Sequence, residues 1–209
     1  MDTKQRILRV AREAFAENGV KDATVRDICA KAGANMAAIH YHFGSKEKLF
    51  MAVLTELMLS GEERYPSDMG LPPNSPAEDR LKAYITSLLY KIAGSGDAQE
   101  EKLNKLFTQE FCDPSESFGV LMERFIKPQH AQLLGIVREL LPPGAEERTV
   151  QLCTAGILGH CLLFDNLRQM ILRICPQISL DALGVAFVAK FVFEFSLAGI
   201  AQAKEFKGE

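Results

Sequence analysis

The chain has 209 residues, of which 47% are hydrophobic, enough to fill the core of one large domain or two small ones. The formal net charge is −3, but residues 1–50 hold nine Lys and Arg against six Asp and Glu, and the remainder holds 15 against 21. A basic head on an acidic body permits nucleic-acid binding, which needs only a locally basic surface. The five cysteines form no CxxC pair and we see no secretory leader, so we expect a cytoplasmic protein with reduced thiols rather than a disulfide-bonded secreted one.

The first third of the chain predicts short helices separated by glycine and polar residues. No run of alternating apolar and polar residues reaches strand length, so we expect an all-α fold. Apolar residues at three- and four-residue intervals predict a first helix that ends at Gly19 and a second that runs from a cap at Thr24 to a turn at Gly33. A third helix over about 35–43 and a fourth over about 46–64 follow almost at once.

The rest of the chain predicts longer helices. Residues 65–75 contain three of the nine prolines and are the best candidate for an irregular join. The motif Ser75-Pro76-Ala77-Glu78 is typical of a helix N-terminus, and Asp113-Pro114-Ser115-Glu116 repeats it. We expect helices over about 77–93 and 98–111, a helix interrupted at Pro128, a turn at 142–144, and two long helices over about 146–174 and 180–205.

Two short helices joined by a glycine turn have the spacing of a helix-turn-helix, in which the second helix lies in the major groove of DNA. The first two helices must pack apolar faces against the third. Seven residues are spaced to form that small core, namely Phe15, Val25, Ile28, Ile39, Phe43, Leu49 and Phe50.

The residues of the second short helix that remain exposed are the candidates for reading DNA, namely Asn35, Met36, Ala37, His40 and Tyr41. Asn35 can hydrogen-bond a base edge, and Met36 or Ala37 can contact a thymine methyl group. We expect phosphate contacts from Thr24, Arg26, Tyr41, Lys46 and Lys48, helped by the N-terminus of the fourth helix.

The segment from Ala32 to Leu49 reads AGANMAAIHYHFGSKEKL and closely resembles the signature of the TetR family of regulators. The upstream Ala14-Phe15, Gly19 and Thr24-Val25-Arg26-Asp27-Ile28 fit the same pattern, and the resemblance covers about residues 5–55. The family usually has a large aliphatic residue where this chain has Ala34, and often Tyr where it has His40. These two departures affect the operator sequence that we expect, and they do not affect the expectation of DNA binding.

The resemblance implies a bacterial DNA-binding regulator with a helix-turn-helix domain over residues 1–50 and a helical effector-binding and dimerisation domain over residues 51–209. The implied partners are double-stranded operator DNA, a second copy of the chain and a small apolar or amphipathic effector. Effector binding would move the fourth helix and change the separation of the two reading heads, so that a repressor leaves a palindromic operator. Two alternatives stay open: a helical small-molecule-binding protein with a vestigial DNA head, and an activator or assembly factor without a ligand pocket.

The two late helices are apolar on nearly all sides, so one face of each is predicted to meet the partner subunit. The apolar stretches over 150–164 and 183–201 are interrupted by polar and charged residues, so we expect buried helices and no membrane partner. The candidate subunit contacts are Ala155, Leu158, Gly159, Leu162, Val185, Val188, Val192, Phe195, Leu197 and Ala201.

The segment from Phe107 to Pro128 resembles the C-terminal domain of the CerR/CecR-type subgroup within the TetR family. Apolar residues of the helical body suggest an effector cavity lined by Leu89, Phe107, Phe111, Phe125, Leu133 and Phe164. Polar contacts to the effector are expected from Gln109, Glu110, His130, His160 or Arg168.

The sequence indicates no other chemistry. Cys153, His160 and Cys161 lie on one helix and do not converge on a metal ion. The cysteines lie in apolar runs without adjacent Lys or Arg, where thiols tend to be inert. Because neither a Gly-x-Ser-x-Gly elbow nor a phosphate-binding glycine loop is present, we expect no enzyme, no metal and no cofactor.

Overall fold

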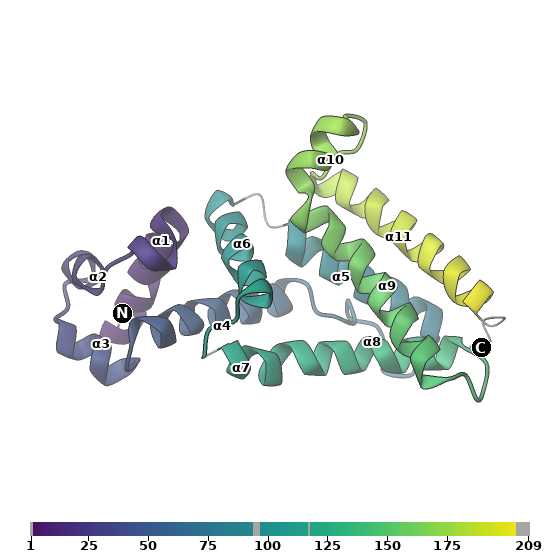
Figure 1. The fold of residues 1–209 in the computed structure, drawn as a ribbon, viewed down its shortest axis with the longest axis horizontal. Coiled ribbons are helices and arrows are strands. Elements are labelled where there is room, and N and C mark those ends of the chain that lie inside the picture. Colours follow the sequence, from purple (N-terminus) through teal and green to yellow (C-terminus); the bar gives the residue numbers. More distant parts are fainter. Residues whose placement is uncertain (1, 94–96, 117, 204–209) are drawn as a thin grey trace. The chain divides into compact units, whose positions relative to one another are not determined.

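The computed structural model describes residues 2–93, 97–116 and 118–203, and the regular structure of these residues is all helical, as predicted (Figure 1). The chain divides into two compact units. Unit 1 comprises residues 1–61 and 96–125, and unit 2 comprises residues 62–95 and 126–209. Unit 1 is larger than the predicted DNA-binding domain over residues 1–50, because a helix from the middle of the chain packs on its first helix.

Unit 1 is built around its first helix. It contains α1 (Thr3–Asp22), α2 (Val25–Ala32), α3 (Met36–His42), most of α4 (Lys46–Arg64), α6 (Ala98–Cys112) and α7 (Phe118–Leu121), with most of a π-helical turn over Met122–Ile126. Helix α1 contacts α2, α3 and α6. The predicted core is confirmed: Phe15, Ile28, Ile39, Leu49 and Phe50 are at most 2% exposed, and Val25 and Phe43 are partly buried against them.

The predicted end of the first helix at Gly19 needs correction. Gly19 has φ 74° and ψ 176°, outside the helical region, but helical geometry resumes and α1 ends at Asp22. The amide of Ala23 donates a hydrogen bond to the carbonyl of Gly19. The glycine therefore kinks the helix instead of ending it, since a positive φ costs glycine little.

A partly buried ion pair and an aromatic cluster hold the middle helices in unit 1. Nη2 of Arg12 on α1 lies 3.6 Å from Oε1 of Glu100 on α6, and Glu100 is 6% exposed. Phe107, Phe111 and Phe118 form a cluster with ring centroids 5.1–6.4 Å apart. Removing one partner of a buried ion pair leaves an uncompensated charge, so the Arg12–Glu100 pair fixes α6 against α1.

Unit 2 is built around α5 (Ala77–Ala93), which contacts α8 (Lys127–Leu140), α9 (Glu147–Asn166) and α11 (Ala182–Ala203). A short helix, α10 (Arg168–Ile174), packs on α9. Figure 1 shows α9 and α11 side by side and running in opposite directions. The predicted interruption at Pro128 falls slightly earlier, because the π-helical turn precedes α8 and Pro128 lies in the first turn of that helix, where proline is tolerated.

One predicted helix forms two helices in the structure. The region predicted as a single helix over 146–174 divides into α9 and α10, which are bent by 71° relative to each other. The break is at Leu167, whose φ of −110° and ψ of 15° lie outside the helical region. The sequence did not indicate it, because apolar residues continue through this region and no Gly or Pro lies at the bend.

The apolar residues of α11 divide between two faces. Val185, Val188 and Val192 are at most 5% exposed and lie in the core of unit 2, so the prediction that they contact a partner subunit is wrong. On the other face, large apolar residues at four-residue spacing form a stripe that is 54–85% exposed. The stripe consists of Leu183, Phe187, Phe191 and Phe195. The stripe is therefore the exposed apolar face of α11, and its contact with a partner subunit stays a prediction.

The apolar composition of α11 also bears on the membrane prediction. By length and composition, Leu183–Ala203 is apolar enough to cross a membrane, and 33% of the segment tested is buried. The expectation that its charged residues exclude it from this class is therefore corrected. A core helix has the same features, and α11 packs along α5 and α9.

Glu62, the first residue of unit 2, gathers hydrogen bonds from three segments. Its carboxylate accepts from the amide and the hydroxyl of Ser67, from Nζ of Lys91 on α5 and from Nε2 of Gln129 on α8. Partial burial raises the pKa of Glu62, but hydrogen bonds from Lys91 and Ser67 outweigh it and hold the pKa below its ordinary value. The network ties the loop after α4 to α5 and α8.

Replacing Glu62 by Gln should lower the free energy of unfolding by about 1 kcal/mol near neutral pH, because Lys91 loses its charged acceptor. The effect is modest, since the Glu62 side chain is 40% exposed and water screens the pair. Folding lowers the pKa of Glu62, so the parent's advantage is full above the unfolded value of about 4.3 and is lost as the pH falls through the folded value. Urea unfolding over a pH series measures this difference. Glu63→Gln, at the exposed neighbouring position, is the control, and equal effects of the two variants would contradict the network.

Candidate nucleic-acid interface

The first helix of the helix-turn-helix begins at the predicted cap. Oγ1 of Thr24 accepts a hydrogen bond from the amide of Asp27 at 3.1 Å and donates one to its carboxylate at 2.6 Å. Helix α2 ends at Gly33, whose φ of 59° and ψ of 40° lie in the left-handed region that favours glycine. Both predicted ends are confirmed. The hydroxyl of Thr24 is thus engaged within the chain, whereas Arg26, two residues later, is exposed.

Asn35 caps the recognition helix α3. Its Oδ1 accepts a hydrogen bond from the amide of Ala38 at 2.8 Å. The sequence predicts a base contact for this side chain, and with Oδ1 engaged in the cap the Nδ2 hydrogens can make one. Such a donor meets acceptors on a base edge, for example N7 or O6 of guanine.

His40 is held by a backbone carbonyl at the end of α3. Its Nδ1 lies 2.9 Å from the carbonyl oxygen of Gly44. A carbonyl oxygen only accepts, so Nδ1 carries a proton and donates. In the neutral ring Nε2 is then an acceptor, and it can meet the amino groups of cytosine or adenine in the major groove.

The other predicted contacts on α3 are exposed. Met36 is 53% and Tyr41 is 86% exposed, and Ala37 is exposed as well. The ring of Tyr41 touches only the edge of His42, with centroids 5.0 Å apart, among the ring contacts of the described residues. Packing inside unit 1 therefore does not account for an aromatic residue at position 41.

The two lysines at the start of α4 differ in their surroundings. Nζ of Lys46 donates to the carbonyls of Lys21 and Ala23, both at 3.3 Å, and so binds the end of α1. Lys48 is exposed, and its amide donates to Oγ of Ser45, which caps α4. The sequence did not indicate the bonds of Lys46, because they join residues 23 and 25 positions apart. Lys48 is the freer of the two for a phosphate.

Five predicted effector residues lie in unit 1. Phe107 and Phe111 belong to the aromatic cluster of α6 and α7, and Phe125 packs on the unit 1 core with the guanidinium of Arg124 5.3 Å from its ring centroid. Glu110 accepts hydrogen bonds from the amide and the hydroxyl of Ser115 at 3.0 and 2.7 Å. Glu110 therefore stabilises the turn after α6, a role that the sequence did not indicate. Gln109 is exposed.

The other predicted effector residues lie in unit 2. Phe164 lies beside Leu89 where α5, α9 and α11 meet, and Leu133 is fully buried in the same core. His160 borders a groove between α9 and α11. His130 is exposed on α8, and Arg168 is half-buried at the start of α10. Contact of any of these residues with an effector stays a prediction.

The helix-turn-helix and the helical body each match a protein family. Residues 7–53 match the family of bacterial regulatory proteins called the tetR family. Residues 77–200 match the C-terminal domain of the HTH-type transcriptional dual regulator CecR. The chain belongs to the TetR family. The predicted resemblances, to this family and to its CecR-type subgroup, are confirmed.

Relatives of this TetR-family regulator are regulators themselves. CecR of Shigella flexneri, named a transcriptional dual regulator, is 28% identical over 81% of this chain and 78% of its own length. The transcriptional regulator SrpR of Pseudomonas putida is 32% identical over 60% of this chain and 54% of its own length. This protein is accordingly a DNA-binding transcriptional regulator, and its named relatives are regulators, not enzymes.

Solved structures show the same fold. A transcriptional regulator from Rhodococcus sp. Rha1 has a TM-score of 0.64 at 18% identity, covering 99% of this chain and 100% of that one. The fatty acid degradation regulator FadR from Bacillus halodurans also has a TM-score of 0.64, at 19% identity over 93% of this chain and 98% of its own. At these identities the likeness concerns the fold.

Replacing Asn35 by Ala removes the cap of α3 and should lower the free energy of unfolding by about 1 kcal/mol. Asn35→Ser keeps an oxygen that can accept from the amide of Ala38, so it should retain most of the stability. Urea unfolding of the three proteins checks this. An Asn35→Ala variant as stable as the parent would show that the cap contributes nothing to the fold.

Proposed function

We propose that this regulator is a repressor that binds a two-fold symmetric operator as a homodimer and leaves it when a small hydrophobic effector binds the helical body. The main support is the exposed face of α3, where Tyr41 is 86% and Met36 is 53% exposed beside Ala37 and His40. A helix that enters the major groove needs such a face, with short side chains that let its backbone approach the bases.

The exposed groups divide by the part of DNA that they can contact. Nδ2 of Asn35 and Nε2 of His40 would hydrogen-bond base edges, and Met36 or Ala37 would touch a thymine methyl group. These contacts would determine the operator sequence. Contacts to phosphates position the protein, and we assign them to Thr24, Arg26, Tyr41, Lys46 and Lys48.

Effector control would act through α4, which contains residues of both units. Leu49 and Phe50 near its start lie in the unit 1 core, and Glu62 near its end belongs to the unit 2 network. A ligand that binds better to one position of α4 would change the population of the form that fits the operator. CecR is named a dual regulator, which favours activation at some promoters as a second candidate role.

The homodimer would form through the outward stripe of α11, Leu183, Phe187, Phe191 and Phe195, together with the outer face of α9. On α9, Leu152 is 58% exposed and Leu162 and Leu163 are each 39% exposed. Contiguous exposed apolar surface of this kind marks protein interfaces. A two-fold axis would pair each stripe with its own copy and give an operator with two half-sites.

Lys48→Ala should weaken binding to all DNA sequences about equally and reduce the slope of log affinity against log salt by about 0.9, the loss of one phosphate contact. Asn35→Ser should instead change the preference at one base pair by about 1–3 kcal/mol. Tyr41→Ala should abolish the specific complex. Gel shifts with the chain's own upstream intergenic DNA over a salt series measure all three, with Lys190→Ala, an exposed residue of α11, as the control.

The same assay tests the alternatives. If the parent forms no complex at low salt, the result would favour a vestigial DNA head. Release of the DNA on addition of small hydrophobic compounds tests effector control.

Phe191→Asp should convert the dimer to a monomer, because a carboxylate in an apolar interface is costly to desolvate. Operator affinity should fall with it, since each half-site would bind separately. Light scattering gives the mass of the particle. Lys190→Asp, at an exposed neighbouring position outside the stripe, should stay dimeric, and a dimeric Phe191→Asp variant would rule out this interface.

A further inference from the structure

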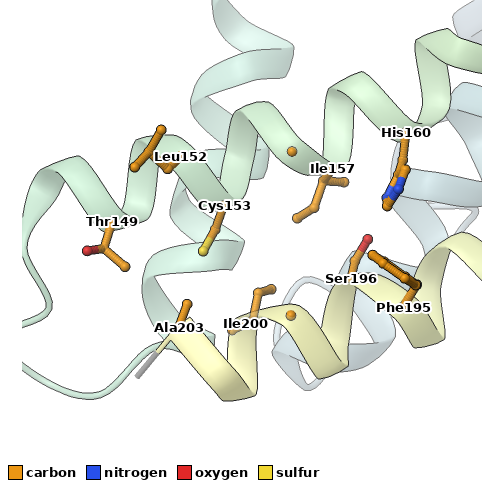
Figure 2. Close-up of a pocket in the computed structure, with 11 residues that line it drawn as sticks. Thr149, Leu152, Cys153, Ile157, His160, Phe195, Ser196, Ile200 and Ala203 are labelled. Atoms are coloured by element: carbon orange, nitrogen blue, oxygen red, sulfur yellow. The ribbon is translucent and has the colours of Figure 1, made fainter. Parts of the chain in front are cut away.

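A groove between α9 and α11 continues the face that we assign to the homodimer (Figure 2). Leu152 of α9 and Phe195 of the outward stripe both line it, so a second copy that pairs through these helices covers it. The groove measures about 310 Å³, and Gly156 and Gly199 on its walls carry no side chain to fill it. Because interface cores are packed as closely as protein interiors, side chains of the second copy have to enter the groove.

Ser196 places a buried hydrogen-bonding group in this groove. The residue is 6% exposed, and its Oγ has no hydrogen-bond partner among residues 2–93, 97–116 and 118–203. Figure 2 shows the hydroxyl pointing from α11 toward α9, between Ile157 and His160. A buried hydroxyl without a partner costs free energy, and the cost persists in a dimer unless the second copy supplies a polar group.

The polar groups that line the groove limit the choice of partner. None of the described lining residues is charged, and those with a hydrogen-bonding side chain besides Ser196 are Thr149, Cys153 and His160. Of these three, His160 lies at the same end of the groove as Ser196, with its ring edge-on against Phe195 and the centroids 4.7 Å apart. One nitrogen of a neutral imidazole donates and the other accepts, so either tautomer can bond a serine hydroxyl.

We propose that the second copy of the chain fills this groove and that Ser196 hydrogen-bonds to His160 of the partner subunit. Two-fold symmetry makes the bond reciprocal, so it forms twice in each dimer. The proposal rests on the homodimer proposed above and adds what fixes the register of its helices. Apolar side chains tolerate a shift along the helix, whereas a shifted copy would leave two buried hydroxyls without partners. The pair would therefore select this pairing over shifted pairings and over other chains with an apolar residue at either position.

Mixed dimers test whether the bond crosses between subunits. Ser196→Ala and His160→Phe each remove one member of the pair, so a homodimer of either variant forms neither bond. A mixed dimer keeps one intact bond, between Ser196 of one subunit and the partner subunit's His160. If that bond raises dimer affinity about fivefold, an equimolar exchanged mixture should contain about four fifths mixed dimers instead of the statistical share of about one half. Native mass spectrometry of full-length chains with tags of different mass measures this share.

The matched control is Lys190→Ala mixed with the parent, which should give the statistical share because Lys190 is an exposed residue of α11 that does not line the groove. If His160→Phe forms no folded dimer, His160→Leu takes its place in the exchange. A statistical share for the Ser196→Ala and His160→Phe mixture would overturn the proposal, since a bond within one chain or to another group gives no preference. A monomeric parent in light scattering would overturn the homodimer as well, so the two failures give different results.

Discussion

The edge-to-face contact of Phe15 on α1 with Phe50 on α4, whose ring centroids are 5.2 Å apart, joins α4 to the helix on which the recognition helix α3 packs. Ile39 of α3 is 1% exposed in the same core. Because interiors are close-packed, α3 cannot turn about its axis without displacing Ile39 from this core. The identity of the side chains that α3 exposes is therefore decided by packing on its opposite face.

The groups proposed to read DNA are themselves ordered by bonds inside the helix-turn-helix. Asn35 uses its oxygen for the cap of α3, and His40 uses one ring nitrogen for the carbonyl of Gly44. Asn35 then offers donors at Nδ2, and His40 in its neutral form offers an acceptor at Nε2. Such ordering limits the base pairs that fit and reduces the entropy lost on binding.

Local signals in the sequence were sufficient for the helix-turn-helix. Thr24 and Gly33 determine the ends of α2 through bonds within a few residues, so their residue types predict them. The sequence did not predict the break at Leu167 or the inward valines of α11, because tertiary packing decides both. The contacts of Lys46 and Glu62 join segments far apart in the chain, and composition carries no signal for such pairs. Phosphate and effector contacts stay predictions, since no bound partner tests them.

Helix α11 is apolar on nearly all sides because its two faces meet different surroundings. Valines pack against α5 and α9, where branched side chains fit close approach, and phenylalanines form the outward stripe. Ser196 lies beside Phe195 and is buried against α9, so it lies at the boundary between these faces. A hydroxyl there adds nothing to the apolar contacts of either face, and its free-energy cost is offset only when another molecule supplies a hydrogen bond.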